Sequence, residues 1–395
     1  MERKINSLVI GAGFSGAVLA RELAMHLDRK IVVIDARGHV GGNCDTQRDN
    51  ATGIMVHTYG PHIFNTDNEE VWNYVNKFGT FRPFVNRVKA KTARGIFGLP
   101  MNLLTINQFF RKSMGPREAA AFLAQLGDKH IKHPANFEEA ALKLVGRELY
   151  EVFFYGYTSK HWGCDPREIP ASVFSRIPVR FNYDDSYYDS RYQGIPEEGY
   201  TRVIERILDH ERIEVRLGVE YEHAMEAEFD HVFYTGPIDG FFGHQLGRLG
   251  YRTVTFERFE TAGDYQGNAV INYTELEVPY TRVHEHKHFA PWEVHEKTVA
   301  FREFSKGTAA GDVPYYPIRK ASDRKLLESY YDLARLEERV SFLGRLGTYR
   351  YLDMDDVIAE ALEFSRRWLR YAATGSGEKP RFSFDPFLSS THAAV

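Results

Sequence analysis

The segment Gly11-Ala-Gly13-Phe-Ser-Gly16 constrains the fold of this chain more than any other stretch. An apolar run from Ile5 to Ile10 precedes it, and Phe14 to Leu27 follows with helical periodicity. Glycines at this spacing between a strand and a helix permit a tight turn, close approach of the backbone to a pyrophosphate, and close packing of the helix on the strand. The pattern therefore predicts a βαβ unit that binds a dinucleotide at the helix N-terminus.

The residues after this helix indicate which dinucleotide to expect. The β-branched run Ile31 to Ile34 ends in Asp35, whose carboxylate can accept hydrogen bonds from a ribose hydroxyl. Gly41-Gly42-Asn43 follows, and this arrangement resembles the extended fingerprint of one large group of FAD proteins. A second glycine pair lets the chain run close beside a long cofactor, so we expect FAD. A tight packing turn and an ordinary loop are the alternatives for the two glycine motifs.

Length and composition set outer limits on the function. A chain of 395 residues is long enough for two or three domains. The net charge of −4 favours neither nucleic acid nor an anionic membrane as a partner. The two cysteines, Cys44 and Cys164, lie far apart and fit no disulfide or zinc spacing, so we expect a cytoplasmic protein. No run approaches the roughly 20 apolar residues of a membrane span.

The predicted secondary structure changes several times along the rest of the chain. Helical periodicity runs from Asn102 to about Trp162, and the Tyr- and Asp-rich stretch from Val173 to Tyr200 reads as an extended segment. Strand-like runs without intervening helices predict an antiparallel sheet, at Ile213 to Leu217, Val232 to Thr235, Thr253 to Glu257, Ala269 to Tyr273 and Lys297 to Glu303. We expect helices again at Asp323 to Arg339 and from Asp355 to about Ala372, and a largely disordered tail from Ser376 to Val395.

These patterns predict an α/β fold with a Rossmann-like FAD-binding domain, an inserted helical domain and an antiparallel β-sheet domain. The FAD-binding domain would comprise residues 1–80, 200–245 and 317–372. The helical domain would comprise residues 102–172. The antiparallel substrate domain would comprise residues 81–101, 173–199 and 246–316, and residues 373–395 would form the tail.

A series of further motifs narrows the function. From about residue 5 to about residue 370, and in the same order, the chain resembles the bacterial UDP-galactopyranose mutase family. The motifs that carry the resemblance are Tyr59-Gly-Pro-His62-Ile-Phe64, Gly156-Tyr157-Thr158, Trp162-Gly163, Arg176-Ile-Pro-Val-Arg180, Arg191-Tyr-Gln-Gly-Ile-Pro196, Gly267-Asn-Ala-Val-Ile-Asn272, Pro279-Tyr-Thr-Arg282, Glu285-His-Lys-His-Phe289, Pro314-Tyr-Tyr316-Pro317, and Gly344-Arg345-Leu346 with Tyr351 and Asp353.

The resemblance implies a redox-neutral isomerase that interconverts UDP-galactopyranose and UDP-galactofuranose. FAD would be active when reduced, with flavin N5 attacking the anomeric carbon as UDP leaves. The resemblance also implies NAD(P)H or another reductant for the flavin, a role in cell-surface glycan biosynthesis, and a homodimer or larger homo-oligomer.

Family position also assigns roles to individual residues. Arg176 and Arg282 would bind the diphosphate and stabilise the developing charge of the leaving group. His62 would lie beside the isoalloxazine, where it could relay a proton, although a hydrogen-bonded core histidine is an equal alternative. The remaining substrate contacts would be Asn86, Phe153, Phe154, Tyr157, Thr158, Trp162, Tyr187, Asn272, Tyr316 and Tyr351. One of Phe153 and Phe154 should instead face the core, because neighbours on a helix point in different directions.

The expected cofactor contacts fall into three stretches and one isolated residue. They are Gly11, Gly13, Phe14, Ser15 and Gly16; Asp35, Ala36, Gly42, Asn43, His62 and Ile63; Val219; and Arg345, Leu352, Asp353 and Met354. Asp353 stands where a helix N-cap would direct backbone N–H groups towards the flavin.

Two alternatives to this function stay open on the sequence, a flavin amine oxidase or dehydrogenase and a non-catalytic flavin-binding protein. His284, His286 and His288 alternate as on one face of a strand, a spacing that would suit a metal. No carboxylate or cysteine motif completes such a site, so we expect no metal.

Overall fold

The computed structural model describes residues 6–174, 178–318 and 323–387. Its first sheet contains five parallel strands in the order β10-β2-β1-β11-β17. These strands are β1 (Ser7–Ile10), β2 (Ile31–Asp35), β10 (Ile213–Leu217), β11 (His231–Tyr234) and β17 (Val340–Phe342). The order places β1 at the centre, with the chain proceeding outward first to one side and then to the other, as in a Rossmann fold.

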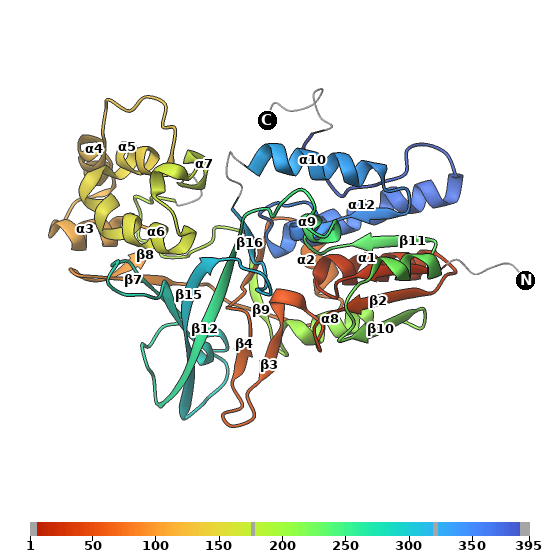
Figure 1. Cartoon of the computed structure of the whole chain (residues 1–395). Coiled ribbons are helices and arrows are strands. Elements are labelled where there is room, and N and C mark those ends of the chain that lie inside the picture. The colour runs from red at the N-terminus through yellow and green to blue at the C-terminus, as the bar shows by residue number, and fades with distance from the viewer. Residues whose placement is uncertain (1–5, 175–177, 319–322, 388–395) are drawn as a thin grey trace, which may run out of the picture.

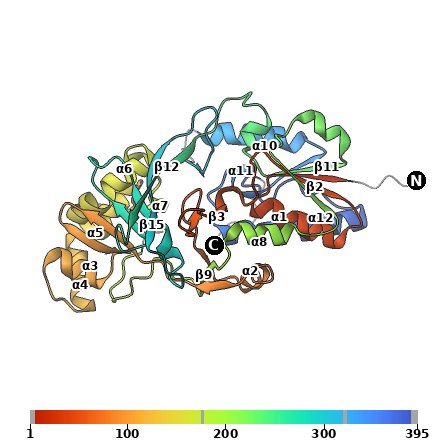
Figure 2. The same cartoon turned by 90° about the horizontal axis from the view of Figure 1, so that it is seen from below.

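Both faces of the central strands are buried, which explains why β1, β2 and β11 are largely apolar. Val9, Val33 and Phe233 pack against α1 (Phe14–His26), α8 (Tyr200–Leu208) and α12 (Met354–Thr374). On the other face, Leu8 and Val32 belong to a core shared with α9 (Ile238–Phe241) and α10 (Asp323–Leu336). Figures 1 and 2 show the sheet between these two helical layers.

The second sheet contains seven strands in the order β16-β12-β15-β14-β13-β7-β8. They are β7 (Val88–Thr92), β8 (Gly95–Leu99), β12 (Tyr251–Ala262), β13 (Val270–Tyr273), β14 (Arg282–Glu285), β15 (Lys297–Gly307) and β16 (Tyr316–Pro317). Its neighbours are antiparallel except β13 and β7, which run parallel. The sheet stands beside the Rossmann-like unit in Figure 1.

The helical insertion packs as a separate layer over one end of the second sheet (Figure 1). It comprises α3 (Leu103–Phe110), α4 (Pro116–Leu126), α5 (Phe137–Leu149), the π-helix η2 (Tyr150–Tyr155), α6 (Gly156–Trp162), the 3₁₀ turn η3 (Pro166–Glu168) and α7 (Ala171–Phe174). Aromatic side chains fill its core, where Phe97, Phe109 and Phe153 have ring centroids 5.4 to 5.7 Å apart.

Short elements connect the larger units. A three-stranded sheet joins β5 (Phe64–Thr66), β9 (Tyr192–Pro196) and β6 (Phe81–Pro83), and a hairpin joins β3 (Thr46–Arg48) to β4 (Met55–His57). The other elements are α2 (Glu69–Val75), α11 (Gly344–Gly347) and the 3₁₀ turns η1 (Gly42–Cys44), η4 (His223–Glu228) and η5 (His286–Phe289). None of the helices in the described part of the chain has both the length and the apolarity of a membrane span.

The predicted fold class is confirmed, but two predictions about individual segments are wrong. The runs now seen as β10 and β11 are parallel strands of the first sheet, not strands of the antiparallel one. β11 is buried throughout, whereas the edge strand β10 alternates apolar and charged residues, so the residue pattern of a strand does not reveal which sheet it joins. The division into three domains by residue ranges stays a prediction.

The second wrong prediction concerns the tail. Its described part, residues 376–387, is ordered against the free edge of β17, where Phe342 N donates to Arg381 O at 2.7 Å and Ser383 N donates to Phe342 O at 3.0 Å. Phe382 is buried beside Tyr331 and Phe342. The polar residues of the tail did not indicate that Phe382 is buried or that the tail backbone hydrogen-bonds to β17.

Candidate active site

The first glycine motif leaves no room for side chains at two of its positions. A Cβ on Gly11, whose φ is +101°, would lie 2.1 Å from Thr235 Oγ1, and a Cβ on Gly16 would lie 2.0 Å from the Gly11 carbonyl oxygen. Gly13 precedes α1 with an extended backbone. The turn therefore brings the N-terminus of α1 directly against the end of β1, as a diphosphate-binding turn requires.

The second glycine pair runs alongside the first motif. Gly41 N donates to Ala12 O at 2.9 Å, and Gly42 Cα lies 4.0 Å from the position that a Cβ would take on Gly13. Gly41 and Gly42 both have positive φ, at 98° and 56°. Two backbones without side chains thus face each other, and this cradle fits a dinucleotide.

Asp35 ends β2 beside this cradle. Its carboxylate accepts hydrogen bonds from Ala12 N at 2.8 Å and from Arg37 N at 2.9 Å. The carboxylate oxygens keep further lone pairs, so Asp35 can still accept from a ribose hydroxyl. Val219 N donates to Asp35 O at 3.0 Å, which holds the turn after β10 against the end of β2.

The other expected cofactor residues lie around these turns. Phe14, Ser15 and Gly16 are buried in the first turn of α1, Ile63 is buried before β5, and Ala36 is exposed. Arg37 Nη2 donates to Asn43 Oδ1 at 2.8 Å. A Cβ on Gly344 would lie 2.5 Å from Ser15 Oγ, so the segment carrying Arg345 to Met354 packs against the start of α1.

Arg282 begins β14 and is held by Glu303 on the neighbouring strand β15. Its Nε donates to both Glu303 carboxylate oxygens at 2.8 Å, and the two residues are register partners in the sheet. The Arg282 side chain is 25% exposed, whereas Glu303 is 2% exposed. Burial works to lower the pKa of Arg282, but the Glu303 carboxylate and the nearby Tyr157 and Tyr316 raise it well above its usual value.

Three predicted tyrosines surround this guanidinium. Burial raises the pKa of Tyr157, Tyr187 and Tyr316, and in each case the Arg282 charge works in the opposite direction. They come from α6, from the segment before β9 and from β16, so the fold gathers distant parts of the chain around one cation. Phenols that stay protonated can each donate a hydrogen bond to an anion.

Arg345 connects this cluster to the cofactor side. Its Cζ lies 5.3 Å from the ring centroid of Tyr351 and 5.6 Å from that of Tyr316, and these two rings stack with centroids 5.7 Å apart. Arg345 Nε donates to Leu352 O at 2.9 Å. Asp353 is the N-cap of α12, as predicted, and its backbone N donates to Asp356 Oδ2 at 3.2 Å.

His62 lies near both arginines. Its pKa is lowered to about 4, mainly by burial, with the charges of Arg345 and Arg282 adding to the effect. His62 Nδ1 lies 2.8 Å from Gly60 O, which can only accept, so Nδ1 carries the proton and Nε2 is an acceptor. At neutral pH the imidazole is therefore uncharged.

Two predicted asparagines are buried with unused acceptors. Within the described residues, Asn86 Oδ1 and Asn272 Oδ1 accept no hydrogen bond. Asn272 pairs with Arg282 across β13 and β14, and Asn86 O accepts from Tyr187 N at 2.8 Å. Since an unsatisfied buried acceptor is costly, these two oxygens suit a ligand that carries hydroxyl or amide donors.

Four of the remaining predicted substrate residues lie in the helical layer. Phe153 and Phe154 are both buried in its core, against Phe97 and Phe174, although only one of them was expected there. Thr158 is buried on α6, and Trp162 packs partly against the same core. The structure does not bring the two phenylalanines to the tyrosine cluster. Arg176 lies outside the described residues.

Sequence reasoning missed two residues of this cluster. Glu303 ends a strand-like run in which an acidic residue among Phe and Val indicates a buried, partnered carboxylate. His161 stands four residues after Tyr157 on α6, and the two rings stack with centroids 5.8 Å apart. Spacing of four on a helix would have indicated this contact.

His284, His286 and His288 do not lie on one face of a strand, as their alternation would allow. The strand ends at Glu285, and His286 begins the turn η5, where it packs between His57 and Phe301. Among the described residues, the group whose side chains could converge on a cation is Asp264, Glu285 and His288. Lys287 Nζ lies 2.5 Å from Asp264 and already neutralises part of it.

Comparisons with known proteins agree with this geometry. The family model described as UDP-galactopyranose mutase matches residues 152–351, and one described as an NAD(P)-binding Rossmann-like domain matches residues 9–78. A Klebsiella pneumoniae protein described as "Probable UDP-galactopyranose mutase" is 53% identical over 96% of this chain and 98% of its own. An Escherichia coli "dTDP-fucopyranose mutase" is 50% identical over 92% of this chain and 98% of its own.

A solved structure supports the fold. The protein titled "Crystal structure of reduced UDP-Galactopyranose mutase" aligns with a TM-score of 0.72, covers 95% of both chains and is 15% identical. At that identity the likeness concerns the architecture alone. The family model and the 53% identical relative concern the chain itself. This enzyme belongs to the UDP-galactopyranose mutase family.

Proposed function

We propose that the protein interconverts UDP-galactopyranose and UDP-galactofuranose with FAD bound along its two glycine turns. The observation that best supports this proposal is the cluster around Arg282. A cation held by a buried carboxylate and surrounded by protonated tyrosines suits a diphosphate leaving group, and it adjoins a cradle suited to a dinucleotide.

Arg282 would stabilise the charge that develops on UDP as its bond to the sugar breaks. Glu303 accepts from Nε, and within the described residues the two terminal amino groups of Arg282 donate no hydrogen bond. A planar guanidinium oriented in this way offers those groups to phosphate oxygens. Tyr157, Tyr187, Tyr316 and Tyr351 would add neutral donors, and by family resemblance Arg176 would add a second cation.

Reduced FAD would supply a nucleophilic N5 for the anomeric carbon. The cradle residues would hold its diphosphate at the N-terminus of α1, and Asp353 would direct the N-terminus of α12 towards the flavin ring. His62, neutral at physiological pH, would offer Nε2 as an acceptor without adding positive charge. Asn86 and Asn272 would accept from sugar hydroxyls.

A second substrate pair follows from the comparisons. Because a dTDP-fucopyranose mutase is nearly as similar to this chain as the Klebsiella relative, dTDP-fucose is the competing substrate. It differs from UDP-galactose at the sugar C6 hydroxyl, at the base methyl group and at the ribose 2′-hydroxyl. The diphosphate contacts proposed for Arg282 would serve both nucleotides, so only a direct comparison separates them.

The decisive experiment is chromatography of each nucleotide sugar after incubation with the dithionite-reduced protein. A new UDP-galactofuranose peak, with no oxidant consumed, is the expected result. Faster conversion of dTDP-fucopyranose would shift the assignment to that substrate. If neither sugar is isomerised while FAD is bound, the flavin oxidase or the non-catalytic flavin protein becomes the better explanation.

The Arg282→Gln variant tests the leaving-group role, with Arg258→Gln as its matched control. Arg258 lies on β12 of the same sheet but is 46% exposed and pairs with Asp49 and Glu260. We expect kcat/KM to fall well over tenfold in the first variant alone, with an unchanged flavin spectrum. Arg176→Ala should behave like Arg282→Gln, and near-normal turnover would remove Arg176 from the proposal.

Three further proposals concern the cellular setting. We expect NAD(P)H or another reductant to keep the flavin reduced, a homodimer or larger homo-oligomer, and a cytoplasmic location. Anaerobic NAD(P)H reduction of the bound flavin, sedimentation equilibrium and cell fractionation test them in turn.

A further inference from the structure

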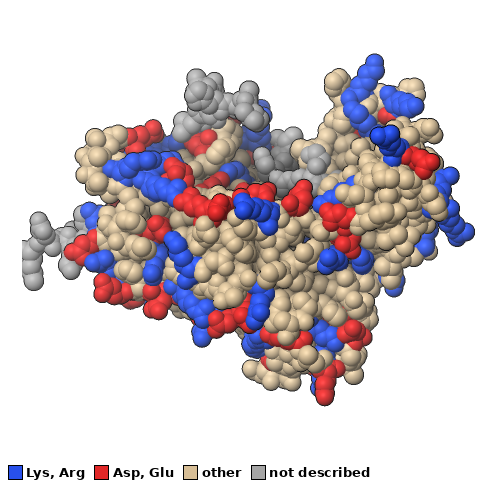
Figure 3. All heavy atoms as spheres, turned by 180° about the vertical axis from the view of Figure 1, so that it is seen from behind, with Lys and Arg blue, Asp and Glu red and all other residues tan. Residues whose placement is uncertain are grey.

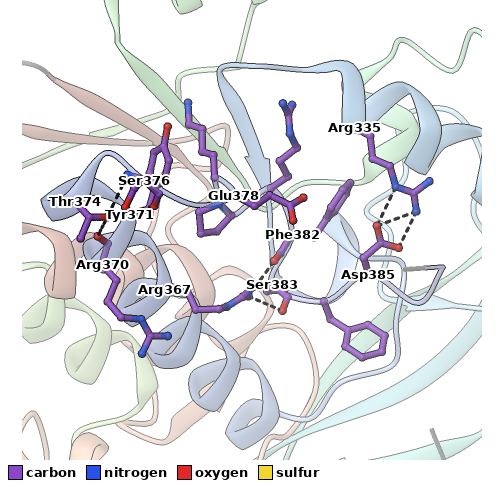
Figure 4. Close-up of a pocket in the computed structure, with 14 residues that line it drawn as sticks. Arg335, Arg367, Arg370, Tyr371, Thr374, Ser376, Glu378, Phe382, Ser383 and Asp385 are labelled. Atoms are coloured by element: carbon purple, nitrogen blue, oxygen red, sulfur yellow. Dashed lines mark hydrogen bonds and ion pairs between the residues drawn. The ribbon is translucent and has the colours of Figure 1, made fainter. Parts of the chain in front are cut away.

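A second basic pocket, formed by other residues than the Arg282 cluster, lies between the end of α12 and the ordered tail. It encloses about 660 Å³ and is lined by fourteen residues, five of them basic (Arg335, Arg367, Arg370, Lys379 and Arg381) and two acidic (Glu378 and Asp385). Figure 4 shows Arg335, Arg367 and Arg370 around this space. On a chain with a net charge of −4, such an excess of cations in one place is unusual. Elsewhere both signs are interspersed, as over the face in Figure 3.

Only part of this positive charge is neutralised by the protein. Arg335 forms a two-pronged pair with Asp385 at 2.8 to 3.1 Å, and Arg370 lies 3.8 Å from Glu363. Within residues 6–174, 178–318 and 323–387, Arg367, Lys379 and Arg381 have backbone carbonyls as partners and no carboxylate within 4.0 Å. These three half-buried cations thus have no carboxylate in direct contact, although Glu360 and Glu363 act on Arg367 and Glu338 acts on Lys379 from a greater distance.

The surroundings of these cations disfavour their charged forms. Burial lowers the pKa of Lys379, and the neighbouring charges of Arg381 and Arg339 lower it further. Burial also lowers the pKa of Arg367; the charges of Glu363 and Glu360 oppose this effect, and Arg370 adds to it. A bound anion would offset both the repulsion and part of the desolvation.

We propose that this pocket binds a diphosphate-bearing small molecule, such as inorganic pyrophosphate or a nucleoside diphosphate. Its basic lining residues come from two segments, with Arg367 and Arg370 on α12 and Lys379 and Arg381 on the tail. A diphosphate carries two anionic groups and so offers partners to cations on both segments. The volume is in the range of small-molecule sites, and Tyr371 supplies an aromatic surface beside the cations.

The site is separate from the proposed active site. Asp353 caps one end of α12 beside the cofactor cradle, and Thr374, at the other end, lines the pocket. A helix of 21 residues spans about 30 Å at 1.5 Å per residue. The ligand would therefore be an additional anion bound on the outer edge of the Rossmann-like unit, and not a substrate in the catalytic cavity.

Calorimetric titration of the FAD-bound protein with inorganic pyrophosphate tests the proposal. The titration uses the Arg282→Gln variant, because this substitution weakens pyrophosphate binding at the proposed active site. We expect one class of pyrophosphate-binding sites to remain in this variant. Lys379→Gln/Arg381→Gln added to that background should weaken binding at least about tenfold, because two charge-assisted contacts are lost. Arg366→Gln is the matched control on α12: Arg366 is exposed, pairs with Glu70 and does not line the pocket.

Because Lys379 and Arg381 also hold the tail, Arg370→Gln provides a second variant at an exposed position. It should weaken pyrophosphate binding without altering thermal stability. Titration with UDP then shows whether the nucleoside contributes to binding. An affinity equal to that of pyrophosphate indicates recognition of the diphosphate alone, and tighter binding of UDP indicates that the nucleoside is recognised too. Absence of binding in the Arg282→Gln background, binding unaffected by the pocket variants, or an equal loss in Arg366→Gln would overturn the proposal.

Discussion

Glu303 accepts hydrogen bonds from Arg282 Nε through both carboxylate oxygens, each at 2.8 Å. It also accepts from Thr281 Oγ1 at 2.9 Å, and its side chain is almost completely buried. A carboxylate this buried is stable only while it is paired, and the guanidinium is oriented only while the carboxylate is charged. The pair therefore acts as one unit that directs the remaining Arg282 donors towards the tyrosine cluster.

Glu303→Gln should lower kcat/KM at least about tenfold, because the amide retains the shape of the carboxylate but not the charge that orients Arg282. Glu257→Gln, which removes an exposed carboxylate paired with Arg302, is the control and should leave the rate unchanged. Steady-state kinetics with equal FAD content in both proteins is the measurement. An unaltered rate in Glu303→Gln would show that Arg282 needs no such partner.

Gly13→Val should abolish cofactor binding while the protein still folds. Gly13 has an extended backbone at φ −81°, and a Cβ there meets no atom closer than 4.0 Å, so the added side chain is tolerated locally but fills the cradle. Gly38→Val is the matched control, since a Cβ on Gly38 meets nothing within 4 Å. Flavin absorbance per mole of purified protein measures the difference. Full flavin content in Gly13→Val would contradict the cradle.

Phe382→Ala should destabilise the protein by about 3–5 kcal/mol, the usual cost of emptying a buried aromatic site. The Phe382 ring stacks on Tyr331 at 4.7 Å and is 6% exposed, whereas Phe384, two residues on, is 44% exposed. Phe384→Ala loses mainly its contact with Arg350 and should cost under about 1 kcal/mol. Urea unfolding of the two variants measures both values. Equal, small losses would mean that the tail is not anchored.

Acidification should weaken the fold between about pH 6.5 and pH 3. Burial lowers the pKa of His286 to about 3, with a further contribution from Arg258, and burial lowers the pKa of His161 to about 3 as well. A folded-state pKa below the unfolded value of 6.5 means that the unfolded chain binds more protons in this window. The associated stability is fully present above pH 6.5 and is lost as the pH falls towards 3.

The loss should approach about 1.4 kcal/mol per pH unit for each such histidine. His286→Asn retains an acceptor for His57 N, which now donates to His286 Nδ1 at 3.2 Å, and removes the titrating ring. Its unfolding free energy should therefore fall less between pH 7 and pH 5 than that of the wild type. His130→Asn, at an exposed position, is the control substitution. Identical slopes in all three proteins would exclude this histidine as a source of acid sensitivity.

Some errors of the sequence interpretation share a cause. The runs at residues 213–217 and 231–234 predicted strands, but their partners in the sheet could not be read from them. Nothing in the tail marked Phe382 as a buried residue, because its partners Tyr331 and Phe342 are 51 and 40 positions earlier in the chain. In both cases the missing information was the identity of a distant surface.

The conformation of the glycine turns in the proposed cofactor cradle was predictable from contiguous residues. Gly11, Gly16 and Asp35 need only the strand and helix beside them to adopt their conformations, because sterics at a tight turn are decided by the nearest neighbours. The family motifs added Arg282, Tyr316 and Tyr351 by position. Glu303 and His161 had no motif of their own, and their roles became visible only as contacts.

The sequence by itself determined the βαβ turn, the Rossmann-like class and the family, because these depend on local backbone sterics and on the order of many short motifs. Only the tertiary structure decided that Glu303 orients Arg282, that Phe153 and Phe154 both face a core, and that the tail closes a basic pocket. Such contacts join residues far apart in the chain. Their free energy depends on surfaces that exist only after the elements have packed together.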